Sequence, residues 1–136
     1  TALLVLEHAS LTDEVTVEQA DLDMITADSS NAGLRAGETL TVENLLACLL
    51  LPSGNESAYV LARHVAGDYQ AFVDMMNSRA AELGCTGTHF VNPCGLHDDD
   101  HYTTAHDMAL ILSEAEKSAD FVRISGSATW DLPETR

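Results

Sequence analysis

The sequence predicts a mainly α-helical chain with short β-strands at its edges. Four segments carry apolar residues at helical spacing, within residues 41–51, 55–67, 68–84 and 104–112. Two short β-branched pieces, at residues 15–17 and 40–42, are typical of strands. The chain has 136 residues, of which 46% are apolar and 21% are charged. This is the composition of a globular protein and the length of one domain.

The chain opens with an unbroken apolar run at residues 2–6, which fits either the last turns of a buried helix or a core strand. Residues 12–40 then alternate β-branched pieces with polar turns, which predicts a loop-rich excursion with two or three short strands. Neither a basic leader nor an initiator methionine precedes the apolar run. We therefore expect the beginning of this first segment to be missing.

Three helices are expected in the middle of the chain. Thr41 is the predicted N-cap of a helix that is apolar nearly all round, which indicates burial on every side. Pro52 ends this helix because proline lacks the backbone donor that a helix needs. The next helix starts after Asn55 and stops at Gly67. Asp68 then caps a third helix, which closes near residue 84.

A fourth helix and a β-rich end complete the predicted elements. Thr104 and Asp107 have the spacing and polarity of a capping pair. Residues 121–132 are β-rich, which predicts a strand or hairpin that leaves the helical unit. The predicted buried stripe of the fourth helix consists of Ala105, Met108, Ala109 and Leu112.

The charge balance excludes two classes of partner. Six Lys and Arg residues oppose 22 Asp and Glu residues, so the formal net charge is −16. A nucleic-acid binder needs Lys and Arg to neutralise phosphates, and an anionic membrane surface also attracts basic residues. The longest apolar run, residues 45–51, is far shorter than the roughly 20 residues that span a bilayer. Lys117 is the only lysine, so a mechanism that needs two lysines is excluded.

The cysteines and histidines do not predict a metal site. Cys48 lies in an apolar helix and is expected in the core, while Cys85 and Cys94 flank a short loop and either pair or stay free. The tract at residues 97–101, with His106 and Asp107 nearby, offers imidazole and carboxylate ligands. Its spacing matches neither an HExxH motif nor an EF-hand loop, so a solvated acidic loop is expected and no metal.

A polar tripeptide, Ser53-Gly54-Asn55, separates the buried helix from the amphipathic one that follows. It faces the interior at a helix N-terminus, an unusual place for unpaired polar groups. Taken alone, it can be a simple helix cap formed by Ser53 or Asn55. A Ser/His/Asp triad is not supported, because no G-x-S-x-G motif is present, and His64 falls on the solvated side of its helix.

The tripeptide and its surroundings resemble the S-x-N region of serine D-alanyl-D-alanine carboxypeptidases, the low-molecular-weight penicillin-binding proteins. Further blocks match in the same order, so the resemblance covers essentially the whole chain. Residues 1–7 resemble the remainder of the helix whose first turn carries the nucleophile of this family. The other blocks are LTVENLL at 40–46, LPSGNESA at 51–58, residues 76–84 from MN to AELG, THFVNPCGL at 88–96 and HYTTAHDMA at 101–109.

This resemblance implies the α/β fold of serine β-lactamases and penicillin-binding proteins, in which helices pack on a central antiparallel sheet. It implies removal of the terminal D-alanine from peptidoglycan stem peptides through an acyl-serine intermediate, with β-lactams as covalent inhibitors. No metal or organic cofactor is implied. Such an enzyme works outside the cytoplasmic membrane, where its substrate lies, so an extracytoplasmic location is expected.

Three motifs build the site in this family: S-x-x-K, S-x-N and K-T-G. A serine hydroxyl becomes a good nucleophile only when a neighbouring group takes its proton, which is the role of the lysine in S-x-x-K. By resemblance, Ser53 relays a proton toward the leaving amine. The amide of Asn55 hydrogen-bonds the substrate backbone, so Asn55 is both a catalytic and a substrate-binding residue.

The other two motifs are absent from the sequence. No serine is followed three positions later by lysine, and Lys117-Ser118-Ala119 is not a K-T-G. Residues 1–136 are therefore expected to be a single incomplete unit, the central helical portion of a catalytic domain, and to be inactive alone. Helices that should cover the lost sheet are expected to expose apolar faces and to favour a homo-oligomer.

Several alternatives stay open at this level. The chain can be a naturally truncated pseudoenzyme, or a non-catalytic helical interaction module that only shares sequence with the enzymes. Within the enzyme class, a D,D-endopeptidase or a serine β-lactamase uses a related site. An S-x-x-K encoded just upstream and a K-T-G encoded downstream would exclude the interaction module.

Overall fold

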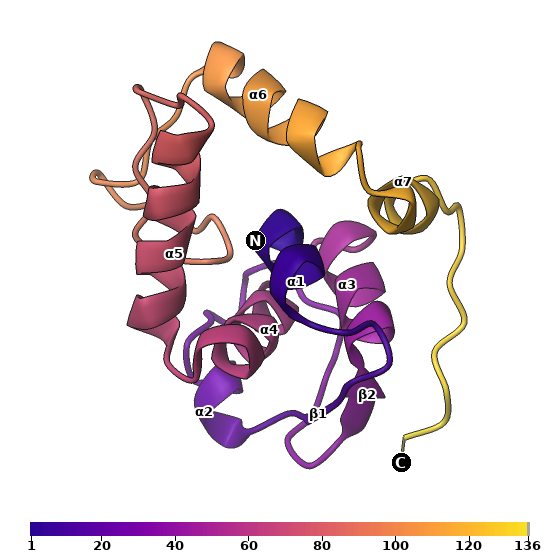
Figure 1. Cartoon of the computed structure of the whole chain (residues 1–136). Helices are drawn as coiled ribbons and strands as arrows, with labels where there is room; N and C mark the ends of the chain where they lie inside the picture. Colours follow the sequence, from indigo (N-terminus) through magenta and orange to yellow (C-terminus); the bar gives the residue numbers. More distant parts are fainter. Residues whose placement is uncertain (136) are drawn as a thin grey trace.

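A computed structural model describes residues 1–135 (Figure 1). Helices dominate this part of the chain, and a small two-stranded sheet lies at one edge, as the sequence predicts. The elements in chain order are α1 (Ala2–His8), β1 (Glu14–Thr16), α2 (Gln19–Leu22), β2 (Thr39–Thr41), α3 (Val42–Leu50), α4 (Asn55–Ala66), α5 (Tyr69–Glu82), α6 (Ala105–Ala115) and α7 (Ala119–Ser125).

Helix α4 is the centre of the fold. It contacts α1, α2, α3, α5 and strand β1, and residues 55–62 are all buried. Leu61 on α4 is fully buried together with Phe72 of α5 and Leu45 and Leu46 of α3. The first apolar run forms the helix α1 rather than a strand. It is part of this core, since Val5 of α1 is fully buried.

The two strands pair antiparallel, with Val15 opposite Leu40. Both of these side chains are buried, while the flanking threonines point outward and join through the hydroxyls of Thr16 and Thr39, 2.8 Å apart. This alternation is what a half-buried strand requires. Both predicted β-branched pieces therefore form strands, and Val42 of the second piece begins α3 instead.

The predicted helix ends are largely confirmed. The Thr41 hydroxyl accepts a hydrogen bond from the backbone N–H of Asn44 at 3.2 Å, as an N-cap does. Asp68 accepts from the N–H of Gln70 at 2.6 Å and so caps α5. Gly67 ends α4 with φ of 78°, a left-handed conformation that glycine adopts without steric cost.

The predicted strand or hairpin at residues 121–132 is wrong. Residues 119–125 form α7 instead, and the described residues beyond it contain no strand. The Ser118 hydroxyl caps this helix by accepting from the N–H of Phe121 at 3.2 Å. Ile124 is fully buried, and α7 packs on α3 and α1. Tertiary packing of one apolar side chain thus outweighs the local β-propensity.

The buried stripe predicted for the fourth helix is also wrong. The capping pair is present, since the Thr104 hydroxyl accepts from the N–H of Asp107 at 3.1 Å. Met108 and Leu112, however, are 46% and 49% exposed. Ala105 and Ala109 are exposed as well, whereas Asp107 and Ala115 are buried. Helix α6 lies at the outside of the molecule between α5 and α7 (Figure 1), and its exposed Met108 and Leu112 form an apolar face toward solvent.

Helix α2, which the sequence did not reveal, joins the excursion to α4 through a buried ion pair. Asp21 is fully buried and accepts two hydrogen bonds from Arg63 of α4, at 2.9 and 2.7 Å. The hydroxyl of Tyr69 and the N–H of Glu18 also donate to this carboxylate, at 2.6 and 2.9 Å. Burial acts to raise the pKa of Asp21, but these hydrogen bonds outweigh it and hold the pKa below its ordinary value of 3.8.

Replacing this carboxylate tests how far the fold depends on it. Asp21→Asn should lower the free energy of unfolding by about 3 kcal/mol, because it removes the buried charged partner of Arg63 and leaves only the exposed carboxylate of Glu18, 3.1 Å away. Exposed Asp23→Asn, which makes the same chemical change, should have an effect within about 0.5 kcal/mol. Urea titration monitored by circular dichroism measures both.

The pH dependence of the free energy of unfolding is a second test of this ion pair. A lowered carboxyl pKa stabilises the fold above the unfolded-state pKa, and this contribution is lost as the pH falls through the folded-state pKa. The stability difference between wild type and Asp21→Asn should therefore be full at pH 7 and shrink as the pH falls below about 4. A difference that stays constant down to pH 2 would contradict the role assigned to the ion pair.

Candidate active site

Ser53 occupies a strained turn between α3 and α4. Its φ of 60° is the one positive value at a non-glycine residue among residues 1–135. This conformation is uncommon outside glycine, asparagine and aspartate, and it persists only where the surroundings hold it. The side chain is exposed, and its hydroxyl makes no hydrogen bond to another described residue. The turn therefore presents an uncommitted hydroxyl at a fixed place.

The middle residue of the tripeptide must be glycine. Gly54 is buried, and its N–H donates to the carbonyl of Cys48 at 2.9 Å. A Cβ at this position would lie 2.7 Å from that same carbonyl oxygen and 3.2 Å from the Cβ of Ala32. Backbone on one side and a loop on the other thus leave no room for a side chain, and the turn is closely packed.

Asn55 is the first residue of α4 and is only 7% exposed. Its N–H donates to the carbonyl of Ser30 at 3.0 Å, but its side-chain amide makes no hydrogen bond to a residue within 1–135. The N-cap of α4 is Gly54, which has no side chain to cap with. The interpretation of Ser53 or Asn55 as a mere helix cap is therefore wrong, and both polar groups remain available to a ligand.

A second loop lies close to the same end of α4. Tyr59 follows Asn55 by one helical turn, and its hydroxyl lies 3.8 Å from the thiol of Cys94. The Cys94 turn is held by Asn92, whose side-chain oxygen accepts from the N–H of Gly95 at 2.7 Å. Burial and the neighbouring thiol raise the pKa of Tyr59, so its hydroxyl stays protonated at neutral pH.

The three cysteines are free thiols, so Cys85 and Cys94 do not pair. Cys48 is buried in the core, as predicted. Burial, with a smaller contribution from the carboxylate of Glu56, raises the pKa of Cys48 to about 11. A thiol with this pKa is uncharged at neutral pH and is a poor nucleophile.

The histidine- and aspartate-rich tract does not converge on one point. His97 is on the surface with 87% of its side chain exposed, while Asp107 points inward and accepts from Thr88 at 2.7 Å. Among residues 1–135, no three His, Cys, Asp or Glu side chains are grouped so that they could hold a metal ion. His64 is half-buried rather than solvated and lies 3.2 Å from Asp13.

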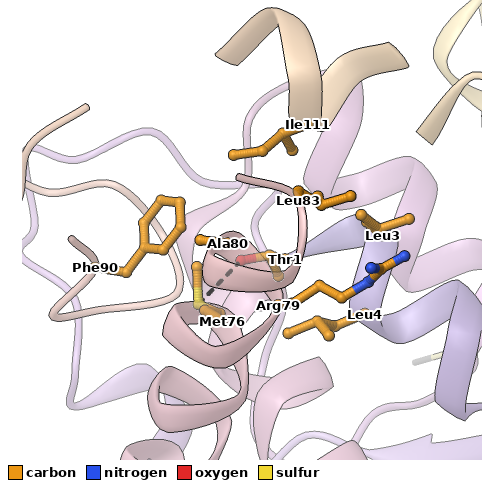
Figure 2. A pocket seen from close by; sticks show the side chains of 9 residues that line it. All are labelled: Thr1, Leu3, Leu4, Met76, Arg79, Ala80, Leu83, Phe90 and Ile111. Atoms are coloured by element: carbon orange, nitrogen blue, oxygen red, sulfur yellow. Dashed lines mark hydrogen bonds between the residues drawn. The ribbon is translucent and has the colours of Figure 1, made fainter. Parts of the chain in front are cut away.

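Two hollows differ in their relation to the tripeptide. An open groove of ≈ 410 Å³ borders the turn at Pro52 and is lined by Cys48, Ala32 and Trp130 among others. The pocket in Figure 2 lies elsewhere, between α1, α5 and α6, with Phe90 at its side. Its volume of ≈ 40 Å³ and largely apolar lining suit neither a peptide nor a catalytic site.

Comparison with known proteins identifies the family. The model of the peptidase S11 family, described as D-alanyl-D-alanine carboxypeptidase, matches residues 1–129. The chain belongs to this family. The peptidase S11 assignment confirms the resemblance seen in the sequence. It also places the tripeptide at residues 53–55 within the matched region.

Two curated relatives show the extent of the match. The chain is 32% identical over 132 residues to D-alanyl-D-alanine carboxypeptidase DacF of Bacillus subtilis, covering 93% of this chain and 33% of the relative. It is 34% identical over 134 residues to DacB2 of Mycobacterium tuberculosis, covering 97% and 45%. The chain thus spans between a third and a half of the length of these relatives.

Solved structures give the same result for the fold. The DD-transpeptidase of a Streptomyces strain superposes with a TM-score of 0.83 at 33% identity, covering 90% of this chain and 50% of that one. A D-alanyl-D-alanine carboxypeptidase from Mycobacterium tuberculosis gives 0.84 at 34% identity, with 93% and 47% covered. The expected penicillin-binding-protein fold is therefore confirmed for the helical part that this chain contains.

The helices described here are too short or too polar to span a membrane.

Three residues that support the tripeptide were not singled out from the sequence, namely Ser30, Ala32 and Glu56. The first two lie in a loop without periodicity, so no sequence signal marked them. Glu56 follows the motif directly, but its burial to 1% exposure is visible only in the structure.

Proposed function

We propose that the chain supplies the S-x-N part of the active site of a serine-type D-alanyl-D-alanine carboxypeptidase. In this proposal residues 1–136 form a single unit that carries one of three catalytic motifs. Ser53 relays a proton toward the leaving D-alanine, and the amide of Asn55 hydrogen-bonds the backbone of a peptidoglycan stem peptide. The reaction proceeds outside the cytoplasmic membrane, and β-lactams act as covalent inhibitors of the complete site.

The observation that carries this proposal is the pair of uncommitted polar groups on a rigid turn. The strained backbone at Ser53 costs stability, and the side-chain amide of Asn55 makes no hydrogen bond to a residue within 1–135. Such costs are typical of sites whose geometry serves a ligand. We place the activity with the carboxypeptidases rather than with endopeptidases or β-lactamases because the family and the relatives carry that name.

The chain by itself should not react with a β-lactam. It lacks an S-x-x-K, so neither the nucleophilic serine nor its lysine base is present. Intact-mass spectrometry after incubation with benzylpenicillin should show the unmodified mass, and peptides that end in D-Ala-D-Ala should stay uncleaved. A stoichiometric acyl adduct would contradict this proposal and would show that another residue serves as nucleophile.

A segment exchange tests the roles of the tripeptide. The chain replaces the matched segment of the Mycobacterium tuberculosis relative, to which it is 34% identical over 134 residues. We expect this chimera to release D-alanine. Ser53→Ala in the chimera should lower kcat/KM by about 100-fold or more, as the loss of a positioned proton-transfer group does. Asn55→Ala should raise KM as well, because it removes a contact to the substrate.

Ser78→Ala is the matched control, since Ser78 is an exposed serine on α5. It should leave kcat/KM of the chimera unchanged. Full activity in the Ser53→Ala chimera, or a chimera that has native circular dichroism but no activity, would count against the proposal.

We also propose that two copies of this chain associate through the exposed apolar face of α6 and α7. Met108 and Leu112 are 46% and 49% exposed, and Val122 is 51% exposed. Large apolar side chains exposed on neighbouring helices favour association. Light scattering should give the mass of a dimer, and the double substitution Met108→Glu with Leu112→Glu should give a monomer. A wild-type monomer over the whole concentration range would exclude this association.

A further inference from the structure

We propose that Glu56 is the positioning residue of the S-x-N turn, through hydrogen bonds that hold residues 30–34 over the motif. This inference rests on the proposed function of Ser53 and Asn55. It assigns a role to the residue that follows the motif, whose side chain is buried inside the protein. Glu56 acts on the chemistry only through the turn that it holds.

The carboxylate of Glu56 binds the backbone of the loop directly. Its Oε1 accepts from the N–H of Ala32 at 2.6 Å and from the N–H of Leu34 at 3.4 Å. A carboxylate that accepts from backbone amides makes stronger hydrogen bonds than a neutral acceptor does. The loop itself has neither helix nor strand at these residues, so these bonds are a main constraint on its path.

The same loop residues touch the catalytic tripeptide. Ala32 is the residue that packs over Gly54, since a Cβ on Gly54 would lie 3.2 Å from the Cβ and 3.3 Å from the nitrogen of Ala32. Two residues earlier, the carbonyl of Ser30 accepts from the N–H of Asn55 at 3.0 Å. Asn55 and Glu56, which are consecutive in α4, thus bind the backbone of residues 30, 32 and 34 in the same loop.

The environment of Glu56 makes this role costly. The residue is 1% exposed, and its Oε2 has no hydrogen-bond partner among the described residues. A buried carboxylate without a cation is destabilising, and its place in the first turn of α4 offsets only part of that cost. An apolar side chain at this position would avoid this penalty. It would leave the backbone N–H groups of Ala32 and Leu34 without the acceptor that Glu56 provides.

Hydrogen exchange on the full 136-residue chain tests the proposal. In Glu56→Ala the backbone amide of Asn55 should exchange about tenfold faster or more than in wild type, relative to the amide of Leu61, which reports global opening. Glu56→Gln keeps an acceptor oxygen of the same reach and should restore most of the protection. Glu56→Asp keeps the charge but is one methylene shorter, so the amide of Asn55 should again exchange about tenfold faster or more than in wild type. This variant carries the test if Glu56→Ala does not fold.

Asp107→Ala is the matched control. Asp107 is 3% exposed and accepts from the N–H of Gly87 at 2.8 Å, but it belongs to α6. This variant should speed exchange at Gly87 and leave Asn55 unchanged. Unchanged exchange at Asn55 in Glu56→Asp, or equal losses in Glu56→Gln and Glu56→Asp, would overturn the positioning role.

A second readout separates this inference from the proposed function. A peptide that ends in D-Ala-D-Ala should shift the side-chain amide resonances of Asn55 in wild type and in Glu56→Gln, but not in Glu56→Asp. If the peptide shifts nothing in wild type while the exchange results hold, the proposed substrate contact of Asn55 is wrong and the positioning role of Glu56 stands. If the exchange results fail, the positioning role is wrong whatever the peptide does.

Discussion

The structure depends on the burial of residues 55–62 of α4. Burial removes water from the polar side chains of this stretch, so a neighbouring element has to supply their partners, and among the described residues only Glu56 Oε2 and Ser57 Oγ are buried without one. Arg63, near the C-terminal end of α4, meets the buried carboxylate of Asp21. Glu56, in its first turn, meets the backbone of residues 32 and 34. These two contacts fix the irregular excursion between α1 and α3 onto the helical core.

The candidate site uses this rigidity. A turn between two packed helices cannot relax, and it therefore holds Ser53 in a backbone conformation that an exposed loop would abandon. Close contact at Gly54 excludes any side chain, and Asn55 is only 7% exposed at the start of α4. The Ser53 hydroxyl and the Asn55 amide make no hydrogen bond to a residue within 1–135, so the turn holds two polar groups in place before a ligand arrives.

Sequence reasoning succeeded where the signal was local. The caps at Thr41, Asp68 and Thr104 follow from side-chain chemistry within three or four residues, and the S-x-N block was recognisable from consecutive residues. It failed where packing decides. Residues 121–125 include the β-branched Val122 and Ile124 but form a helix, because Ile124 enters the core beside α3 and α1. The apolar stripe of α6 has helical period yet faces solvent, since no described element covers it.

The sequence by itself determined the family, the existence of the central helices and the presence of an S-x-N tripeptide between two of them. These follow from residue identity and spacing alone. Only the tertiary structure decided that the tripeptide is no helix cap, that His64 and Asp13 pair, and that Glu56 is buried with a loop as its partner. Ser30 and Ala32 lie more than 20 residues from the motif, and contacts over such separations arise from packing, which no local pattern encodes.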